Sequence, residues 1–338
     1  MNSLKSRLIL FLLPLMCGGA VMAETRHYVF FNMDRERISD RSFLETDSIQ
    51  GAQLKYTWKE LEPQKDRYDF LSIEKDLDFL TSKGKRLFIQ LQDSSFDADR
   101  VNVPLYLLND AQYNGGDAIE RSDDGAITGR VARRWDPAVR ERFSKLLAAL
   151  GKQFDGKIEG INLPETAVEF GESGKYFPEG FTPSAYKDGV IADMKALKRA
   201  FPKSICIQYA NFMPGEFLPW TDKSYLRQVT RRAREMKVGV GGPDLLPYKK
   251  GQMNNCYKFL KESHGKVPTA IAVQDGNCAY TNPRTKKRVT ISELIDFAGN
   301  YLKADYIFWG IEEPYYSNEI IPFLKTLDHK ATTRLSRP

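Results

Sequence analysis

The sequence is poor in histidine and cysteine, has no strong charge of one sign, and has no long apolar run beyond its first residues. Three His and four Cys among 338 residues exclude a disulfide-stapled miniprotein and disfavour a histidine-rich metal site. The formal net charge of +6 is small for this length and the charges are interspersed, which disfavours a dedicated nucleic-acid binder. The apolar share of 42% is typical of a folded domain and excludes a disordered chain and a polytopic membrane protein.

The first 23 residues have the pattern of a signal peptide. Lys5 and Arg7 precede a short apolar run, and small residues then lead to Ala23, after which we expect cleavage. A retained membrane anchor is the alternative, but the run is shorter than the ~20 residues that span a bilayer. We therefore predict an exported protein, periplasmic or secreted, with no membrane segment in its mature form. Cleavage leaves three cysteines, enough for one disulfide and one thiol: Cys206, Cys256 and Cys278.

From His27 onward, short β-branched and aromatic runs alternate with segments of helical period, which predicts a parallel α/β sheet. The eight predicted strands are 27–32, 52–58, 86–93, 158–165, 204–212, 238–244, 269–275 and 304–310. Eight strand and helix units close into a (β/α)8 TIM barrel, which we assign to residues 24–328 as a single domain, with 329–338 as a flexible C-terminal tail. An open doubly wound sheet is the alternative, but the glycine turn it usually has after its first strand is missing.

Helix signals follow four of these strands, with apolar residues at helical spacing and polar caps or prolines at the ends. The four predicted helices follow Asp136-Pro137, follow Thr182-Pro183, end at Gly84, and follow Thr290. Residues 96–135, between the third strand and its helix, are rich in Asp, Gly and Asn. A loop of that length usually forms a lid or a wall of a functional site.

The C-terminal ends of the barrel strands are where catalytic groups stand in this fold. The predicted ends carry acids, amides and tryptophans: Asn32, Trp58, Gln92, Asp93, Glu165, Asn211, Asp244, Gln274, Asp275, Trp309 and Glu312. No histidine is among them, which disfavours serine-hydrolase chemistry. Carboxylates beside amides suit proton transfer to and from sugar oxygens, with no cofactor and no metal.

Glu165 is the first catalytic candidate, because it ends a strongly apolar strand with an acid that barrel packing does not require. We expect a general acid whose pKa is raised by a partly apolar pocket; a solvated loop glutamate is the alternative. Asp275 ends the seventh strand, across the mouth of the barrel, and is the predicted base or nucleophile. An ordinary Asp-Gly turn is the alternative for it. Glu312, Asp244 and Glu60 are in reserve.

Aromatic and basic side chains suggest the substrate class. The tryptophans are expected on one face, where their rings would stack on sugars: Trp58, Trp135, Trp220 and Trp309. With them, the predicted substrate-binding residues are Asp93, Asn162, Asn211, Asp244, Gln274 and Glu312. Basic runs in two loops of the same face are either solvated or attract an acidic glycan: Arg130, Arg133 and Arg134, and Arg284, Lys286, Lys287 and Arg288.

One stretch resembles a known family. Tyr56-Thr57-Trp58-Lys59-Glu60-Leu61-Glu62-Pro63, followed by Tyr68-Asp69-Phe70, is similar to the second βα unit of clan A glycoside hydrolases, especially the β-galactosidase-like families. Val103-Pro104-Leu105-Tyr106-Leu107 is similar to the stretch after the third strand there, and Trp309 to a tryptophan of the eighth strand. The resemblance covers most of residues 50–165.

This resemblance implies a TIM barrel and retaining hydrolysis by two glutamates, placed after the fourth and seventh strands. Glu165 matches the first position, although Pro164 replaces the usual Asn before it and Asn162 lies three residues upstream. Gln274-Asp275 stands where the second glutamate is expected, and an amide cannot form a glycosyl ester.

We therefore expect an exported hydrolase of an oligo- or polysaccharide. Retention through Asp275, inversion by a water held between carboxyls roughly 6.5–9.5 Å apart, and a barrel that binds glycan without cleaving it all stay open. Lyase chemistry at a basic site is a further alternative.

Overall fold

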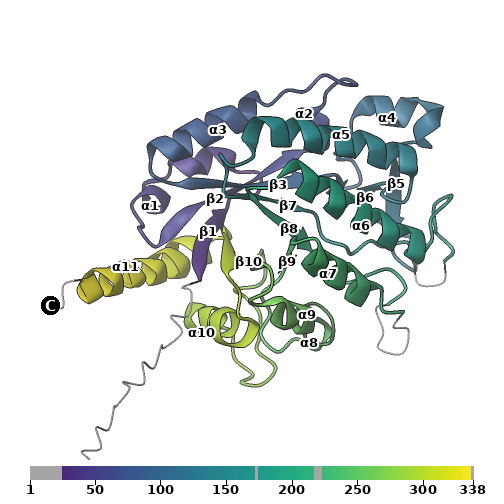
Figure 1. Cartoon of the computed structure of the whole chain (residues 1–338). Coiled ribbons are helices and arrows are strands. Elements are labelled where there is room, and N and C mark those ends of the chain that lie inside the picture. Colours follow the sequence, from purple (N-terminus) through teal and green to yellow (C-terminus); the bar gives the residue numbers. More distant parts are fainter. Residues whose placement is uncertain (1–24, 172–173, 217–222, 336–338) are drawn as a thin grey trace, which may run out of the picture.

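A closed barrel of eight parallel strands forms the centre of the computed structural model, which describes residues 25–171, 174–216 and 223–335 (Figure 1). The strands pair in the order β1-β11-β10-β9-β8-β7-β3-β2, so the first and last strands of the barrel close against each other. Their bounds are β1 (Arg26–Phe30), β2 (Ile49–Thr57), β3 (Arg86–Gln92), β7 (Gly160–Leu163), β8 (Ile205–Tyr209), β9 (Gly239–Gly242), β10 (Thr269–Val273) and β11 (Tyr306–Gly310). The predicted TIM barrel and its eight strands are confirmed. β7 and β10 each end two residues before the acid expected at their ends, so Glu165 and Asp275 begin loops.

Helices surround the barrel (Figure 1). They are α1 (Arg41–Leu44), α2 (Trp58–Leu61), α3 (Leu71–Ser82), α4 (Leu105–Asn109), α5 (Pro137–Phe154), α6 (Pro183–Ala200), α7 (Tyr225–Glu235), α8 (Lys250–Asn254), α9 (Cys256–Ser263), α10 (Ile291–Asp296) and α11 (Ile321–Leu335). Short 3-10 helices are η1 (Arg35–Ser39) and η2 (Ala111–Tyr113), and π-helical turns are η4 (Phe297–Leu302) and η5 (Tyr316–Ile320). The four predicted helices are confirmed, and the Asp136, Thr182 and Thr290 side chains cap α5, α6 and α10 as expected.

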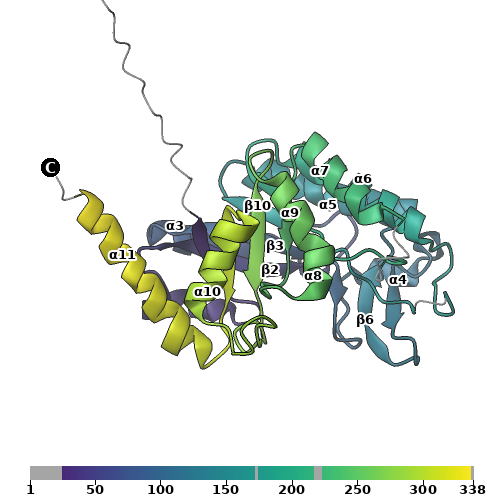
Figure 2. The ribbon, with the colours of Figure 1, turned by 90° about the horizontal axis from the view of Figure 1, so that it is seen from below.

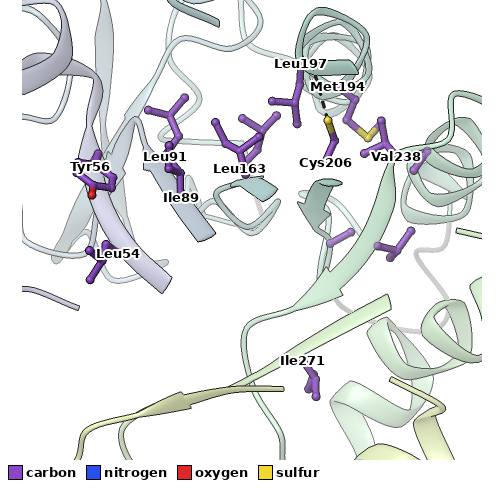
Figure 3. Close-up of a cluster of buried hydrophobic side chains, with 14 of the residues drawn as sticks. Leu54, Tyr56, Ile89, Leu91, Leu163, Met194, Leu197, Cys206, Val238 and Ile271 are labelled. Carbon is purple, nitrogen blue, oxygen red and sulfur yellow. Dashed lines mark hydrogen bonds between the residues drawn. The ribbon is translucent and has the colours of Figure 1, made fainter. Parts of the chain in front are cut away.

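Two apolar layers hold the barrel together because successive side chains of a strand point to opposite faces. The inner layer is aromatic: Tyr28, Phe30, Phe88, Ile207, Tyr209, Ala270, Ala272, Tyr306 and Phe308. Glycines make room for its rings: a Cβ at Gly160 would stand 2.6 Å from the Phe88 ring, and one at Gly241 2.6 Å from the Tyr209 ring. The outer layer packs strands against helices. In Figure 3, Cys206 of β8 faces Leu197 and Met194 of α6.

The long segment between β3 and α5 forms a small antiparallel sheet rather than an irregular loop. Its strands β4 (Ser94–Ser95), β5 (Asp117–Arg121) and β6 (Ile127–Ala132) pair in the order β4-β6-β5. We call this sheet, with the loop 96–103, the flap. Figure 2 shows β6 extending from the body of the molecule on the side of α4. Because β4 directly follows β3, the flap stands at the C-terminal ends of the barrel strands.

The chain termini and the cysteines complete the comparison with the sequence. Residues 1–24, which hold the expected signal peptide, lie outside the described residues. Helix α11 continues to Leu335, past residue 328, where we expected the domain to end. All three cysteines of the described chain are buried free thiols. In the parts of the chain that the structure describes, no helix is both long and apolar enough to cross a membrane.

Candidate active site

Two adjoining cavities open at the C-terminal ends of the barrel strands. The larger, of about 380 Å³, lies between the barrel and the flap, and we call it the flap cavity. The smaller, of about 250 Å³, lies over β10 and β11 and is called the side cavity. The two share four lining residues: Phe30, Asn32, Met33 and Gln274. The two cavities therefore form one continuous surface.

Glu165 lines the flap cavity, where the sequence placed the general acid. Its side chain is partly exposed, and Asn211, buried at the end of β8, donates a hydrogen bond to its Oε2. Burial is the largest cause that raises the pKa of Glu165 to about 7, and the charges of Asp244 and Glu120 act in the same direction. With a pKa of about 7, roughly half of the Glu165 carboxyls hold a proton at neutral pH, and a general acid acts in that protonated form.

Glu120, on β5 of the flap, is a second acid of the flap cavity that sequence reasoning missed. It is buried, its Oε1 accepts a hydrogen bond of 2.9 Å from the backbone N–H of Glu169, and burial raises its pKa to about 7. Opposite it on β6, a Cβ at Gly129 would stand 2.9 Å from Glu120 Oε2 and 2.3 Å from the Ser95 carbonyl oxygen. The flap therefore needs a glycine there to hold this carboxyl. No local pattern in the sequence marks Glu120, because its pairing with Gly129 exists only in the folded flap.

Asp93, predicted to bind substrate, instead pairs with Arg134, which holds the backbone at Glu165. It is buried in a two-pronged ion pair with Arg134, whose Nε donates to Asp93 Oδ2 at 2.9 Å. Arg134 also donates to the backbone carbonyl of Glu165 at 3.0 Å and to the Tyr186 hydroxyl at 2.6 Å. The prediction that Asp93 contacts substrate is wrong in this structure, because both of its oxygens are held by the guanidinium. The pair positions the loop that carries Glu165.

The side cavity brings together three of the predicted acids: Asp244, Asp275 and Glu312. Asp275 is exposed, Glu312 Oε2 accepts from the Gly276 backbone N–H at 2.9 Å, and Asp244 Oδ1 accepts from Asn277 Nδ2 at 3.0 Å. Asn277, which was not singled out, also accepts from the Leu245 backbone N–H at 2.8 Å and so ties the loops after β9 and β10 together. Glu165 and Asp275 thus line adjoining cavities rather than one.

Asn162 lies too deep to touch a ligand. It is fully buried and accepts a hydrogen bond of 2.8 Å from Gln53 Nε2, which also donates to the Tyr209 hydroxyl at 3.1 Å. Its predicted substrate-binding role is wrong for this reason. Glu60, held in reserve as an acid, caps helix α2 through the Thr57 backbone and side chain.

The tryptophans do not form a rim on the open face. Trp58 is fully buried and donates to Glu62 Oε2 at 2.8 Å, and Glu62 in turn pairs with Arg142 of α5. Trp309 is fully buried and donates to His27 Nδ1 at 3.1 Å. The expectation of indoles that stack on a ligand is wrong for both, because Trp58 of α2 packs against Phe143 of α5 and Trp309 is buried in β11.

Trp135 is also buried, among Phe170, Phe181 and Tyr186, so it too is unavailable for stacking. Trp220 lies outside the described residues. Three other aromatic residues line the flap cavity, and of these Phe30 and Tyr209 are buried while Phe96 is 80% exposed.

Several of the basic side chains of the two runs are neutralised. Arg130 forms two hydrogen bonds of 2.8 Å with Asp117, Arg134 pairs with Asp93, and Arg288 pairs with Glu319 at 2.9 Å. Arg284 lies over the Tyr248 ring, 3.5 Å from its centroid. None of the runs lines either cavity, so they do not support an acidic substrate. Among the described residues no group of three or more His, Cys, Asp or Glu is placed to hold a metal ion.

A closed (β/α)8 barrel with acids at its C-terminal face is the class of structure that these observations define. No protein-family model and no curated protein matches the sequence. Among solved structures, xylanase XynB from Paenibacillus barcinonensis, complexed with a conduramine derivative, is similar at a TM-score of 0.50 and 12% identity, covering 85% of this chain and 84% of that one. Xylanase 10B from Thermotoga petrophila RKU-1, complexed with xylobiose, has a TM-score of 0.49 at 13% identity, covering 84% and 81%. At this identity the likeness shows the fold, and the barrel implied by the sequence resemblance is confirmed at that level.

Proposed function

We propose that the protein is an exported glycoside hydrolase that acts on an oligo- or polysaccharide, with Glu165 as the general acid. The observation that carries the proposal is the position of Glu165 at the wall of an open cavity. Its carboxyl has a pKa raised to about 7 and accepts a hydrogen bond from Asn211, and Arg134 holds its backbone carbonyl. Cleavage of a glycosidic bond needs such a group to protonate the leaving oxygen.

The lining of the flap cavity suits a sugar. Its wall carries the amides of Asn32, Gln90, Gln92 and Gln274, which can bind hydroxyl groups. Phe96 offers an exposed ring on which the apolar face of a pyranose can stack. This pairing of a ring with convergent polar groups is typical of ligand sites.

The second carboxylate of the reaction has two candidates. Asp275 keeps the role of base or nucleophile that its strand suggests, and its exposure in the side cavity gives it access to water. Glu120 is the other candidate, because it shares the flap cavity with Glu165. Gln274, which lines both cavities, cannot replace either in a retaining reaction.

The decisive experiment measures new reducing ends from a panel of soluble polysaccharides. The wild-type protein is expected to release them, Glu165→Gln to lose at least about a hundredfold of the rate, and Glu36→Gln, an exposed glutamate away from both cavities, to retain it. Cleavage unchanged in Glu165→Gln would refute the assignment of the acid.

Comparing Asp275→Asn with Glu120→Gln then identifies the second carboxylate. We expect the residue that supplies the base or nucleophile to cause a loss as severe as Glu165→Gln. Proton NMR of the first product shows whether the anomeric configuration is retained or inverted, which separates a nucleophile from a base.

A barrel that binds glycan without cleaving it is the second candidate, and Gln274 at the seventh strand favours it. It requires binding of a polysaccharide with no reducing ends released over a long incubation. Reducing ends that increase in proportion to the protein would exclude it.

Export is tested separately. If the first 23 residues are a signal peptide, the mature protein is recovered outside the cytoplasm and its N-terminal sequence begins at Glu24. An intact Met1 on the exported or retained protein would contradict this part of the proposal.

A further inference from the structure

Two cations of the flap cavity stand apart from the other basic residues of the open face. Lys55 comes from β2 and Arg100 from the flap loop, and both line the cavity that Glu165 lines. Lys55 Nζ donates to Asn32 Oδ1 at 2.7 Å. In the described part of the chain, neither cation has a carboxylate within ion-pairing distance, in contrast to Arg130, Arg134 and Arg288.

The two cations are close enough to influence each other. The pKa of Lys55 is lowered to about 8, chiefly by burial and then by the charge of Arg100, while Asp275 acts in the opposite direction. Two like charges that face one cavity repel each other, and the partial burial of Lys55 strengthens the repulsion. An anion placed between them would remove this cost.

The same cavity holds a buried polar group without a partner. Gln90 is 5% exposed, lines the flap cavity, and its Oε1 accepts no hydrogen bond from the described residues. Buried polar atoms are normally satisfied, so an unsatisfied one at a cavity wall is a position where a ligand hydroxyl can donate.

We propose that the flap cavity binds a sugar that carries a carboxylate, a hexuronic acid residue, with the carboxylate held between Lys55 and Arg100 and the ring over Phe96. The arginine can hold a carboxylate through two N–H groups, and the lysine adds a point charge. A group with a single negative charge suits the cavity better than a dianionic phosphate, because Asp97, Glu120 and Glu165 line it too and oppose further negative charge.

This inference rests on the proposed function for the presence of a sugar, and it names the class of that sugar. The residues that would bind the acidic group are Lys55 and Arg100, which line the flap cavity. They take the place of the basic runs at residues 130–134 and 284–288, which line neither cavity.

The test compares ligands that differ in the charge of the carboxylate. Binding of galacturonate, glucuronate and mannuronate oligosaccharides to the wild-type protein is measured by calorimetry, beside their methyl esters and a sulfated neutral glycan. We expect at least one uronate to bind about tenfold or more tightly than its ester, because a charge-assisted hydrogen bond is lost with the charge.

Variants assign the effect to the two cations. Lys55→Gln/Arg100→Gln should bring the affinity for the uronate to that of the ester. The control Lys286→Gln/Lys287→Gln removes two charges from exposed positions outside both cavities and should leave the preference unchanged. Arg100→Gln alone, on an exposed loop, serves if the double variant does not fold, and should lose part of the preference.

Three outcomes would overturn the inference: no uronate bound more tightly than its ester, a preference that survives in the Lys55 and Arg100 variants, or charge-dependent binding of the sulfated glycan alone. Reducing ends are measured in the same mixtures. Charge-dependent binding without cleavage would refute the proposed hydrolase activity and support the binding of a uronate. Cleavage of neutral glycans alone would support the hydrolase activity and refute the binding of a uronate.

Discussion

The raised pKa of Glu165 predicts that this residue destabilises the folded protein at alkaline pH. In the unfolded chain its carboxyl ionises near the ordinary value of 4.5, and in the folded protein near about 7, chiefly because of burial. Below pH 4.5 both states hold the proton, so the residue costs nothing. As the pH rises from 4.5 to about 7, the folded state retains a proton that the unfolded state has lost, so stability falls over this window and stays at the lower level above it.

The magnitude follows from the same two values. Each pKa unit corresponds to about 1.4 kcal/mol, so the interval between the two pKa values corresponds to a destabilisation of up to about 3–4 kcal/mol above pH 7. Glu165→Gln removes the ionisation and leaves an amide oxygen that can still accept from Asn211. We therefore expect this variant to be more stable than the wild type at pH 8, by about 2–3 kcal/mol, with little difference at pH 4.5.

Urea unfolding at the two pH values measures this difference directly. Glu36→Gln is the matched control, since its side chain is exposed, and its stability relative to the wild type should not depend on pH in this range. The reasoning is refuted if Glu165→Gln has the same effect on the free energy of unfolding at pH 4.5 and pH 8. Such a result would mean that the carboxyl is solvated in the folded protein.

Further predictions concern the groups around the site. Asp93→Asn leaves the Arg134 guanidinium buried without its counter-ion and should cost about 3–5 kcal/mol in urea unfolding; a loss under 1 kcal/mol would show that the pair is dispensable. Gly129→Ala places a Cβ 2.3 Å from the Ser95 carbonyl oxygen, so the flap should open to limited proteolysis while the far-ultraviolet circular dichroism of the barrel persists; unchanged cleavage in the flap would contradict the close packing. Burial lowers the pKa of His27 to about 4, so stability should fall as the pH drops from 6.5 toward 4, where the unfolded state binds a proton that the folded state refuses. His27→Gln should weaken that decline. The same loss of unfolding free energy between pH 6.5 and 4 in the wild type and the variant would disprove this prediction.

The barrel could be predicted because its signal is local and repeated. Most strands are short β-branched or aromatic runs, and four helices show an apolar stripe with a cap, a proline or a closing glycine, so errors at single elements do not change the count. The flap could not be predicted, since β4 has two residues and β5 and β6 contain charged residues and a glycine in place of an apolar run. Only pairing with one another makes them strands.

The site was predictable where a strand end alone decides the position. Glu165 and Asn211 follow neighbouring barrel strands and meet at the same edge, so their hydrogen bond follows from strand order. Glu120 was missed because it reaches the cavity from a segment outside the barrel. Lys55 was missed because nothing in an alternating strand marks which polar side chain will face a cavity.

The sequence by itself determined the closed barrel, the order of its strands and the acid after the fourth, because alternation, capping and strand ends are properties of neighbouring residues. Only the tertiary structure decided which side chains are buried, which are paired and which face a cavity. It buried Trp58 against α5 and Trp309 in the barrel wall, paired Asp93 with Arg134 and left Lys55 at the flap cavity. Burial and ion pairing depend on residues far apart in the chain, so no local sequence pattern predicts which of these side chains is buried or which partner it contacts.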